Sequence, residues 1–223
     1  MTTSADFLSK LNHSQRCAVE HFCGPLLVIA GAGSGKTRAL TYRIANLIIY
    51  NKVNPESILA VTFTNKAAKE MKDRLDKLLA QEISSKNYKQ PFDSLSEFNQ
   101  KKLLSFIYKK TTKQLWIGTF HSLCARILRY DINKYQDSKK RKWDRNFSIF
   151  DESDVQNILK NIILKQFNLD EKTFNPRAIR YAISSAKNLG LSPEEYLKEH
   201  SYSKGRVIAE IYDEYQTQLA ENN

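Results

Sequence analysis

Ala30-Gly31-Ala32-Gly33-Ser34-Gly35-Lys36-Thr37 is the stretch that decides the fold of this 223-residue chain. It follows the apolar run Leu-Leu-Val-Ile at 26–29 and precedes a helix-like segment at 37–49. Glycines let a backbone wrap closely around phosphate groups, because they carry no Cβ atom that would block the approach. The N–H groups of such a loop and of the following helix N-terminus attract anions. The order strand, glycine-rich loop, helix therefore predicts a phosphate-binding loop.

Two side chains at the end of this loop carry the predicted chemistry. Lys36 is expected to reach the β- and γ-phosphates of a nucleotide, and the Thr37 hydroxyl to ligate Mg²⁺. The strict pattern would place glycine where Ala30 stands, although Gly31 and Gly33 keep the loop pliant. An ordinary glycine-rich turn with a chance lysine is the alternative, and the flanking strand and helix disfavour it.

The charge of the chain indicates an anionic partner. Lysine and arginine number 35 against 24 aspartates and glutamates, a formal net charge of +11. Nucleic acid is the first candidate, and a basic surface that serves solubility is the alternative. The hydrophobic content of 41% is normal for a globular protein, and the length suffices for one large domain or two small ones.

Several classes of protein are disfavoured by what the sequence lacks. No segment approaches the ~20 apolar residues that cross a bilayer. Residues 1–6 have neither the basic nor the apolar region of a signal peptide. Cys17, Cys23 and Cys124 show no Cys-x-x-Cys spacing, which favours reduced thiols in the cytoplasm. His121 and Cys124 are too few ligands for zinc.

The first half of the chain alternates between the two kinds of regular structure. A helix is expected over 7–23, ended by glycine and proline, and a buried strand over 57–63. Thr64 or Asn65 can cap the next helix, whose apolar face holds Met71, Leu75, Leu78 and Leu79. Strands at 26–29 and 57–63, each followed by a helix, predict a parallel α/β sheet.

The remainder of the chain changes character twice. Residues 81–113 are polar and read as a surface insertion, partly helical around 98–108, before a strand at 115–120 and a helix at 121–130. A basic loop at 139–145 either contacts phosphates or is simply solvated. Everything after Asp151 reads as helical, with helix-start or helix-stop signals at Asp151, Pro176, Gly190 and Ser192.

Three further stretches lie where a ligand-binding edge is expected. They are Leu-Asn-His-Ser-Gln at 11–15, Thr-Phe-Thr-Asn-Lys-Ala-Ala at 62–68 and Gly-Thr-Phe-His-Ser at 118–122. The last two end predicted strands, and the carboxyl ends of parallel strands line one ligand-binding edge. With the loop at 30–37, these blocks closely resemble the UvrD/Rep/PcrA family of DNA helicases in order and spacing.

The resemblance implies ATP and Mg²⁺ as cofactors. Gln15 would hold the adenine edge, Thr37 would ligate Mg²⁺, and Arg38 would lie near the nucleotide. The rest of the nucleotide site would be the loop itself, Ala30, Gly31, Ala32, Gly33, Ser34, Gly35 and Lys36.

The resemblance also implies single-stranded DNA and single/double-strand junctions as partners. The residues that would contact DNA are Phe63, Thr64, Asn65, Phe120 and His121. Exposed rings can stack on any base without reading sequence. Core packing is the alternative for Phe63 and Phe120, and an ordinary helix-cap or core role is the alternative for His121.

In fold, the resemblance implies an α/β P-loop NTPase with a RecA-like parallel sheet and an inserted all-helical subdomain. Residues 1–125 would form part of subdomain 1A and residues 126–223 part of helical subdomain 1B. Family members carry an acidic Walker B motif, D-E-x-x-D, beyond the helical insertion, and the sequence reaches Asn223 without it. Asp151-Glu152 aligns with the start of subdomain 1B and Asp213-Glu214 falls within a helix, so neither is expected to hold metal.

The sequence therefore predicts the N-terminal part of a cytoplasmic 3′→5′ ATP-dependent DNA helicase that does not turn over ATP by itself. A small P-loop kinase is one alternative, with the 139–145 loop as its lid. A non-enzymatic module that binds single-stranded DNA is another. The cellular pathway and the oligomeric state stay open.

Overall fold

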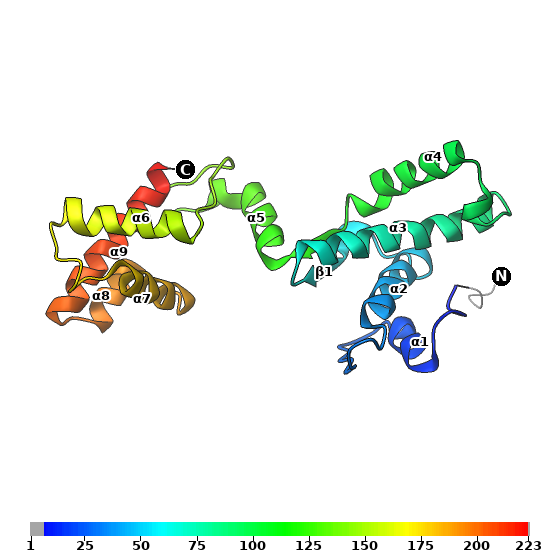
Figure 1. Cartoon of the computed structure of the whole chain (residues 1–223), viewed down its shortest axis with the longest axis horizontal. Helices are drawn as coiled ribbons and strands as arrows, with labels where there is room; N and C mark the ends of the chain where they lie inside the picture. The colour runs from blue at the N-terminus through cyan, green and yellow to red at the C-terminus, as the bar shows by residue number, and fades with distance from the viewer. Residues whose placement is uncertain (1–6, 223) are drawn as a thin grey trace. The chain divides into compact units, whose positions relative to one another are not determined.

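The computed structural model describes residues 7–222, which divide into two compact units, one up to Cys124 and one from Ala125. Each unit has its own buried apolar core. The described chain is mostly helical with a small parallel sheet (Figure 1). None of its described helices combines the length and apolar character that a bilayer crossing requires. The predicted absence of a signal peptide concerns residues 1–6, which lie outside the described part.

The first unit places helices around a pair of strands. Its main elements are α1 (His13–Glu20), α2 (Lys36–Ile49), β1 (Leu59–Thr62), α3 (Asn65–Asn87), α4 (Glu97–Ile107), β2 (Trp116–Thr119) and the start of α5 (Phe120–Asp131). Short 3₁₀ turns lie at Pro55–Ser57 and Phe92–Ser94, and a π-helical turn at Tyr108–Thr112. The strands pair in parallel, with Thr62 opposite Thr119 at their carboxyl ends.

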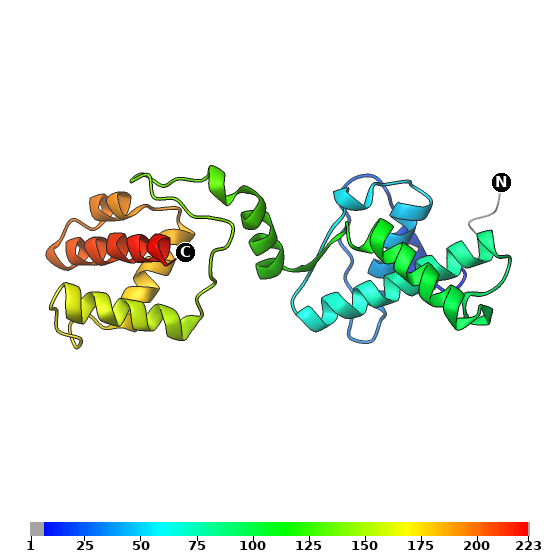
Figure 2. The ribbon, with the colours of Figure 1, turned by 90° about the horizontal axis from the view of Figure 1, so that it is seen from above.

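The long helix α3 organises this unit. It begins where predicted, because the Thr64 hydroxyl accepts a hydrogen bond from the Ala67 amide at 3.1 Å. Met71, Leu75 and Leu79 recur every four residues, so they share one face and are buried. That helix packs against both strands, and α2 and α4 pack against it in turn (Figures 1 and 2).

The predicted strand at 26–29 is wrong for the described structure, and so is part of the first predicted helix. Residues 26–29 join no strand ladder, and Leu27 and Ile29 are 84% and 91% exposed. A continuous apolar run is typical of a parallel strand, but such a strand needs neighbours on its edges and cover on its faces. Within residues 7–222 the sheet holds β1 and β2 alone. The first helix covers His13–Glu20 rather than 7–23.

Residues 81–113 are more structured than a surface insertion implies. The helix predicted around 98–108 is confirmed as α4, but α3 itself continues to Asn87. The segment contributes Leu95, Leu103 and Ile107 to the buried core of the first unit. Polar residues dominate its composition because only one face of α4 is covered, and the apolar positions at that face are few.

The second unit is helical, as predicted. It contains the rest of α5, then α6 (Glu152–Asn161), α7 (Pro176–Asn188), α8 (Pro193–Glu199) and α9 (Ser203–Glu221), with a 3₁₀ turn at Ile132–Lys134 and a π-helical turn at Ile162–Gln166. Asp151 and Ser192 form capping boxes, and Gly190 follows α7 at φ +74°. The core is made by fully buried aliphatic residues of α6, α7, α9 and the π-helical turn, among them Leu159, Ile162, Ile163, Ile179 and Ile211.

Candidate nucleotide-binding site

The glycine-rich loop, residues 30–35, leads directly into α2. Gly33 and Gly35 take positive φ values of +74° and +84°, a conformation that is strained for other residues. Gly35 is the N-cap of α2 and offers no side chain to cap it. The N–H groups of the first helical turn are therefore available to a ligand, and the helix dipole makes an anion the favoured one.

Lys36 folds back over the loop. Its Nζ donates to the carbonyl oxygens of Ala30 at 2.8 Å and Gly31 at 2.6 Å. The Ser34 hydroxyl donates to the same Gly31 carbonyl at 2.7 Å, which tightens the turn. A cation held only by exposed neutral carbonyls can exchange them for a phosphate oxygen, with which it forms a stronger charge-assisted bond.

Gln15 reaches the loop from α1. Its backbone N–H donates to the Asn12 side chain at 2.9 Å, and its own Oε1 accepts from the Asn12 N–H at 3.3 Å, which completes a capping box. Its Nε2 donates to the Ser34 carbonyl at 3.0 Å. Gln15 and Lys36, 21 positions apart, thereby line one pocket of about 240 Å³, together with Ala18, Val28, Gly35 and Ala39.

The neighbouring predicted residues differ in where they point. Thr37 is exposed in the first turn of α2, so its hydroxyl is accessible. Arg38 does not line the pocket; its guanidinium donates to the Lys10 carbonyl at 2.6 Å and lies 5.8 Å from the Tyr42 ring centroid. No cluster of three or more acidic, histidine or cysteine side chains suited to a metal occurs between residues 7 and 222. The loop thus fits a phosphate group, and Thr37 as a ligand of Mg²⁺ stays a prediction.

The predicted DNA-contacting residues gather at the carboxyl ends of the two strands. Phe63 and Phe120 follow the paired residues Thr62 and Thr119, and their side chains are 97% and 62% exposed. The core-packing alternative is therefore wrong for both rings. His121 is also exposed, at the start of α5.

Thr64 and Asn65 also form hydrogen bonds that stabilise the fold. Thr64 caps α3, and the Asn65 side-chain oxygen accepts from the Thr119 hydroxyl at 3.4 Å. These contacts fix the two strand ends that present the rings. They leave Thr64 and Asn65 less free to contact a strand of DNA than their sequence position suggests.

Residues 11–223 match the family described as the UvrD/REP helicase N-terminal domain. The chain belongs to this family. It is 42% identical to the ATP-dependent DNA helicase PcrA of Bacillus subtilis over 219 residues, which are 98% of this chain and 25% of that protein. It is 39% and 38% identical to PcrA proteins of Staphylococcus epidermidis and Staphylococcus aureus. The chain spans about a quarter of the length of these relatives.

The acidic pairs of this UvrD/REP domain have structural partners. Asp151 caps α6, and Glu152 accepts from Arg180 at 2.7 Å. Asp213 accepts from Arg141 at 3.0 Å and forms an ion pair with Lys139. Asp151, Glu152 and Asp213 thus already have partners within the second unit.

The basic loop of the UvrD/REP domain is divided between two roles. The Arg141 side chain is 12% exposed and donates to Asp137 at 2.5 Å, to Asp213 and to the Thr217 hydroxyl at 2.8 Å, which ties the loop to α9. Lys140 lies exposed beside it, at φ +61°. Arg141 is structural, and phosphate contact stays a prediction for the rest of the loop at 139–145, where Lys140 and Lys142 are exposed.

Asn12 also contributes to the site, although the sequence alone did not predict a role for it. Asn12 orients Gln15 through the capping box, so it sets the position of the side chain that meets the loop. The signal was present, because Asn-x-x-Gln before a helix is a capping-box pattern.

Proposed function

We propose that this chain is the nucleotide-binding and single-stranded-DNA-contacting N-terminal part of a 3′→5′ ATP-dependent DNA helicase. The observation that carries the proposal is the shared pocket of Gln15 and Lys36, in a chain that belongs to a helicase family. The named relatives are ATP-dependent DNA helicases, which supports ATP as the nucleotide and DNA as the polymer. The kinase alternative has no comparable support. We further propose that residues 1–125 correspond to subdomain 1A and 126–223 to subdomain 1B, in a cytoplasmic protein.

In this proposal the loop residues divide the work of binding. Lys36 leaves the Ala30 and Gly31 carbonyls for the β- and γ-phosphates, while the α2 amides bind the remaining phosphate oxygens. The Gln15 amide turns from Ser34 to the adenine edge, where it can donate and accept at once. Thr37 offers its hydroxyl to Mg²⁺. Bound ATP would supply the free energy for movement along DNA.

In the proposed helicase, Phe63 and Phe120 contact DNA by stacking on its bases. Rings at the ends of adjacent strands offer bases two neighbouring stacking surfaces, each worth about 1–3 kcal/mol. The Thr119–Asn65 hydrogen bond ties the two ring-bearing segments together.

Binding without turnover is the expected behaviour of this chain by itself. Hydrolysis of a phosphoanhydride requires a carboxylate that holds Mg²⁺ and another group that orients water. Of the candidate acidic residues, Asp151 is engaged as a helix cap, and Glu152 and Asp213 are engaged in ion pairs. A non-enzymatic DNA-binding module is the second candidate, which the exposed rings would serve equally well.

The test measures nucleotide binding and hydrolysis separately. We expect a fluorescent ATP analogue to bind, and Lys36→Ala to weaken binding about tenfold or more through loss of a charge-assisted contact. We expect no ATP hydrolysis above the Lys36→Ala background, with or without oligothymidylate. Clear DNA-stimulated turnover that Lys36→Ala abolishes would overturn the expectation of binding without turnover and direct attention to Asp151 and Glu152. DNA binding without any nucleotide binding would favour the non-enzymatic module.

A further inference from the structure

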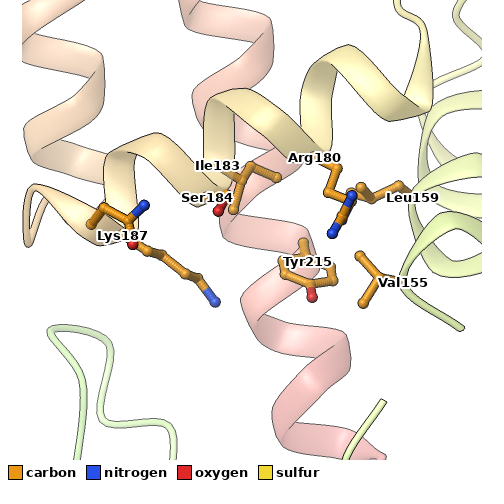
Figure 3. A pocket seen from close by; sticks show the side chains of 8 residues that line it. Val155, Leu159, Arg180, Ile183, Ser184, Lys187 and Tyr215 are labelled. Carbon is orange, nitrogen blue, oxygen red and sulfur yellow. The ribbon is translucent and has the colours of Figure 1, made fainter. Parts of the chain in front are cut away.

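A second pocket lies in the helical unit, in the groove where α6, α7 and α9 meet. It has a volume of about 280 Å³, which suits a small ligand. Its apolar lining comes from Val155, Leu159 and Ile183, and its polar groups from Arg180, Lys187 and Tyr215 together with the neutral Ser184 and Asn188. Figure 3 shows these side chains: the polar ends of Arg180, Lys187 and Tyr215 extend toward the same side of the pocket. The pocket thus combines an apolar wall with a cationic rim.

Lys187 is an unusual cation for a protein surface. Among residues 7–222, no carboxylate lies within ion-pair distance of its ammonium group. The ammonium instead lies 5.2 Å from the Tyr215 ring centroid and 5.9 Å from that of Tyr212. Ring faces attract a cation but do not neutralise it. Burial among these groups lowers the pKa of Lys187 to about 8, because it disfavours the charged form. In the described part of the chain the ammonium form has no carboxylate beside it, and a bound anion would supply the missing counter-charge.

Arg180 adds a second positive group at the other end of the rim. It donates to Glu152 at 2.7 Å, and both side chains are substantially exposed. An exposed pair of this kind holds the guanidinium in place at little net energy. The local charge of Arg180, Glu152 and Lys187 together is therefore close to one positive unit, centred on Lys187.

The shape and charge of the pocket define its ligand. One uncompensated ammonium beside an apolar wall matches a molecule with one anionic group on a flat apolar body. A nucleic acid strand would be expected to follow several exposed basic residues and open rings, as at Phe63 and Phe120 in the other unit. We propose that this pocket binds a small aromatic carboxylate, whose anionic group pairs with Lys187 and whose ring lies against Val155, Leu159 and Ile183.

The experiment uses naphthoate as the probe and the full chain as the protein. Methyl NMR of Val155 and Ile183 reports occupancy of the pocket, and the side-chain NMR signal of Lys187 reports its ionisation. We expect naphthoate to shift the methyl signals and to raise the pKa of Lys187, because a bound anion favours the ammonium form. Acetate, which lacks the ring, and naphthylmethanol, which lacks the charge, are expected to bind about tenfold more weakly or worse.

Matched lysine variants separate the pocket from general basicity. Lys187→Gln should weaken naphthoate binding about tenfold, whereas Lys165→Gln, which removes an exposed lysine of the same unit, should leave it unchanged. Amide NMR spectra of both variants report whether the fold is kept, and Arg180→Gln provides a further pocket variant if Lys187→Gln does not fold. No methyl shift with naphthoate, equal binding by acetate, or unchanged binding in folded Lys187→Gln would overturn the proposal. Methyl shifts produced by oligothymidylate in preference to naphthoate would assign the pocket to DNA instead. ATP and DNA binding at the first unit play no part in these outcomes.

Discussion

Substitution of Gly35 by alanine tests how the glycine-rich loop and α1 are joined. Gly35 has φ +84°, and a Cβ atom at this position would lie 2.5 Å from the Gln15 side-chain nitrogen. Gly33 provides the matched control, because its φ of +74° is similar but an added Cβ would meet nothing within 4 Å. The two substitutions thus share the backbone strain and differ in the clash with Gln15.

The expected cost follows from these two contributions. An alanine in the left-handed region costs about 1–2 kcal/mol, which is all that Gly33→Ala should lose. Gly35→Ala must also displace the Gln15 side chain from the Ser34 carbonyl and disturb the Asn12 capping box. Both interactions are exposed, and the Gln15 amide is the end of a flexible side chain, so together they are worth about 1 kcal/mol and we expect a total loss of about 2–3 kcal/mol.

Urea unfolding followed by circular dichroism measures these losses. The comparison is repeated in a Gln15→Ala background, where the clash and its hydrogen bond are absent. We expect the difference between the two glycine variants to vanish in that background. Equal losses for Gly33→Ala and Gly35→Ala, or a difference that survives Gln15→Ala, would refute the reasoning.

Three further perturbations have defined outcomes. Phe63→Ala should weaken oligothymidylate binding, measured by fluorescence anisotropy, by about 1–3 kcal/mol per stacked base, with the urea midpoint unchanged because the ring is exposed; a shifted midpoint would reveal a structural role. Arg141→Met should lower the free energy of unfolding by about 2–3 kcal/mol, and Lys140→Met by about 0.5 kcal/mol or less. Of the two side chains, Arg141 is the one that binds half-buried carboxylates. Equal effects of the two substitutions would argue against the contact of Arg141 with α9. Burial raises the pKa of Asp137, but hydrogen bonds from Arg141 more than offset this and hold the pKa below the ordinary 3.8. The ionised Asp137 therefore stabilises the folded state fully above pH 3.8, and this stabilisation is lost as the pH falls through the lower folded pKa. The urea midpoints of Asp137→Asn and wild type should converge in acid, and a constant difference between them would contradict this.

Local signals predicted the helices well. Thr64, Asp151 and Ser192 each cap the helix that follows, because a cap depends on residues only a few positions away. The apolar spacing of α3 likewise identified Met71, Leu75 and Leu79 as core. Such features are readable because the physics that produces them is confined to one or two turns.

Features that depend on distant partners were less predictable. The run at 26–29 has the composition of a buried strand, yet a strand exists only when another strand pairs with it. The exposure of Phe63 and Phe120 was equally undecidable, because an aromatic ring at the end of a strand serves a core or a surface equally well. The attachment of Arg141 to Asp213, 72 positions away, has no local signal at all.

The open sheet edges have a consequence for how the protein behaves in solution. Within the described chain β1 and β2 pair only with each other, and Leu27, Ile29 and Leu59 add exposed apolar surface in the same unit. Unpaired edges and apolar patches promote association between copies, while the net charge of +11 opposes it through repulsion. Added salt screens this repulsion and would also weaken the proposed DNA binding by competing for phosphates. A salt titration of DNA affinity will therefore combine two effects, weaker contacts with DNA phosphates and association between copies of the chain. Light scattering at each ionic strength measures the particle size and separates them.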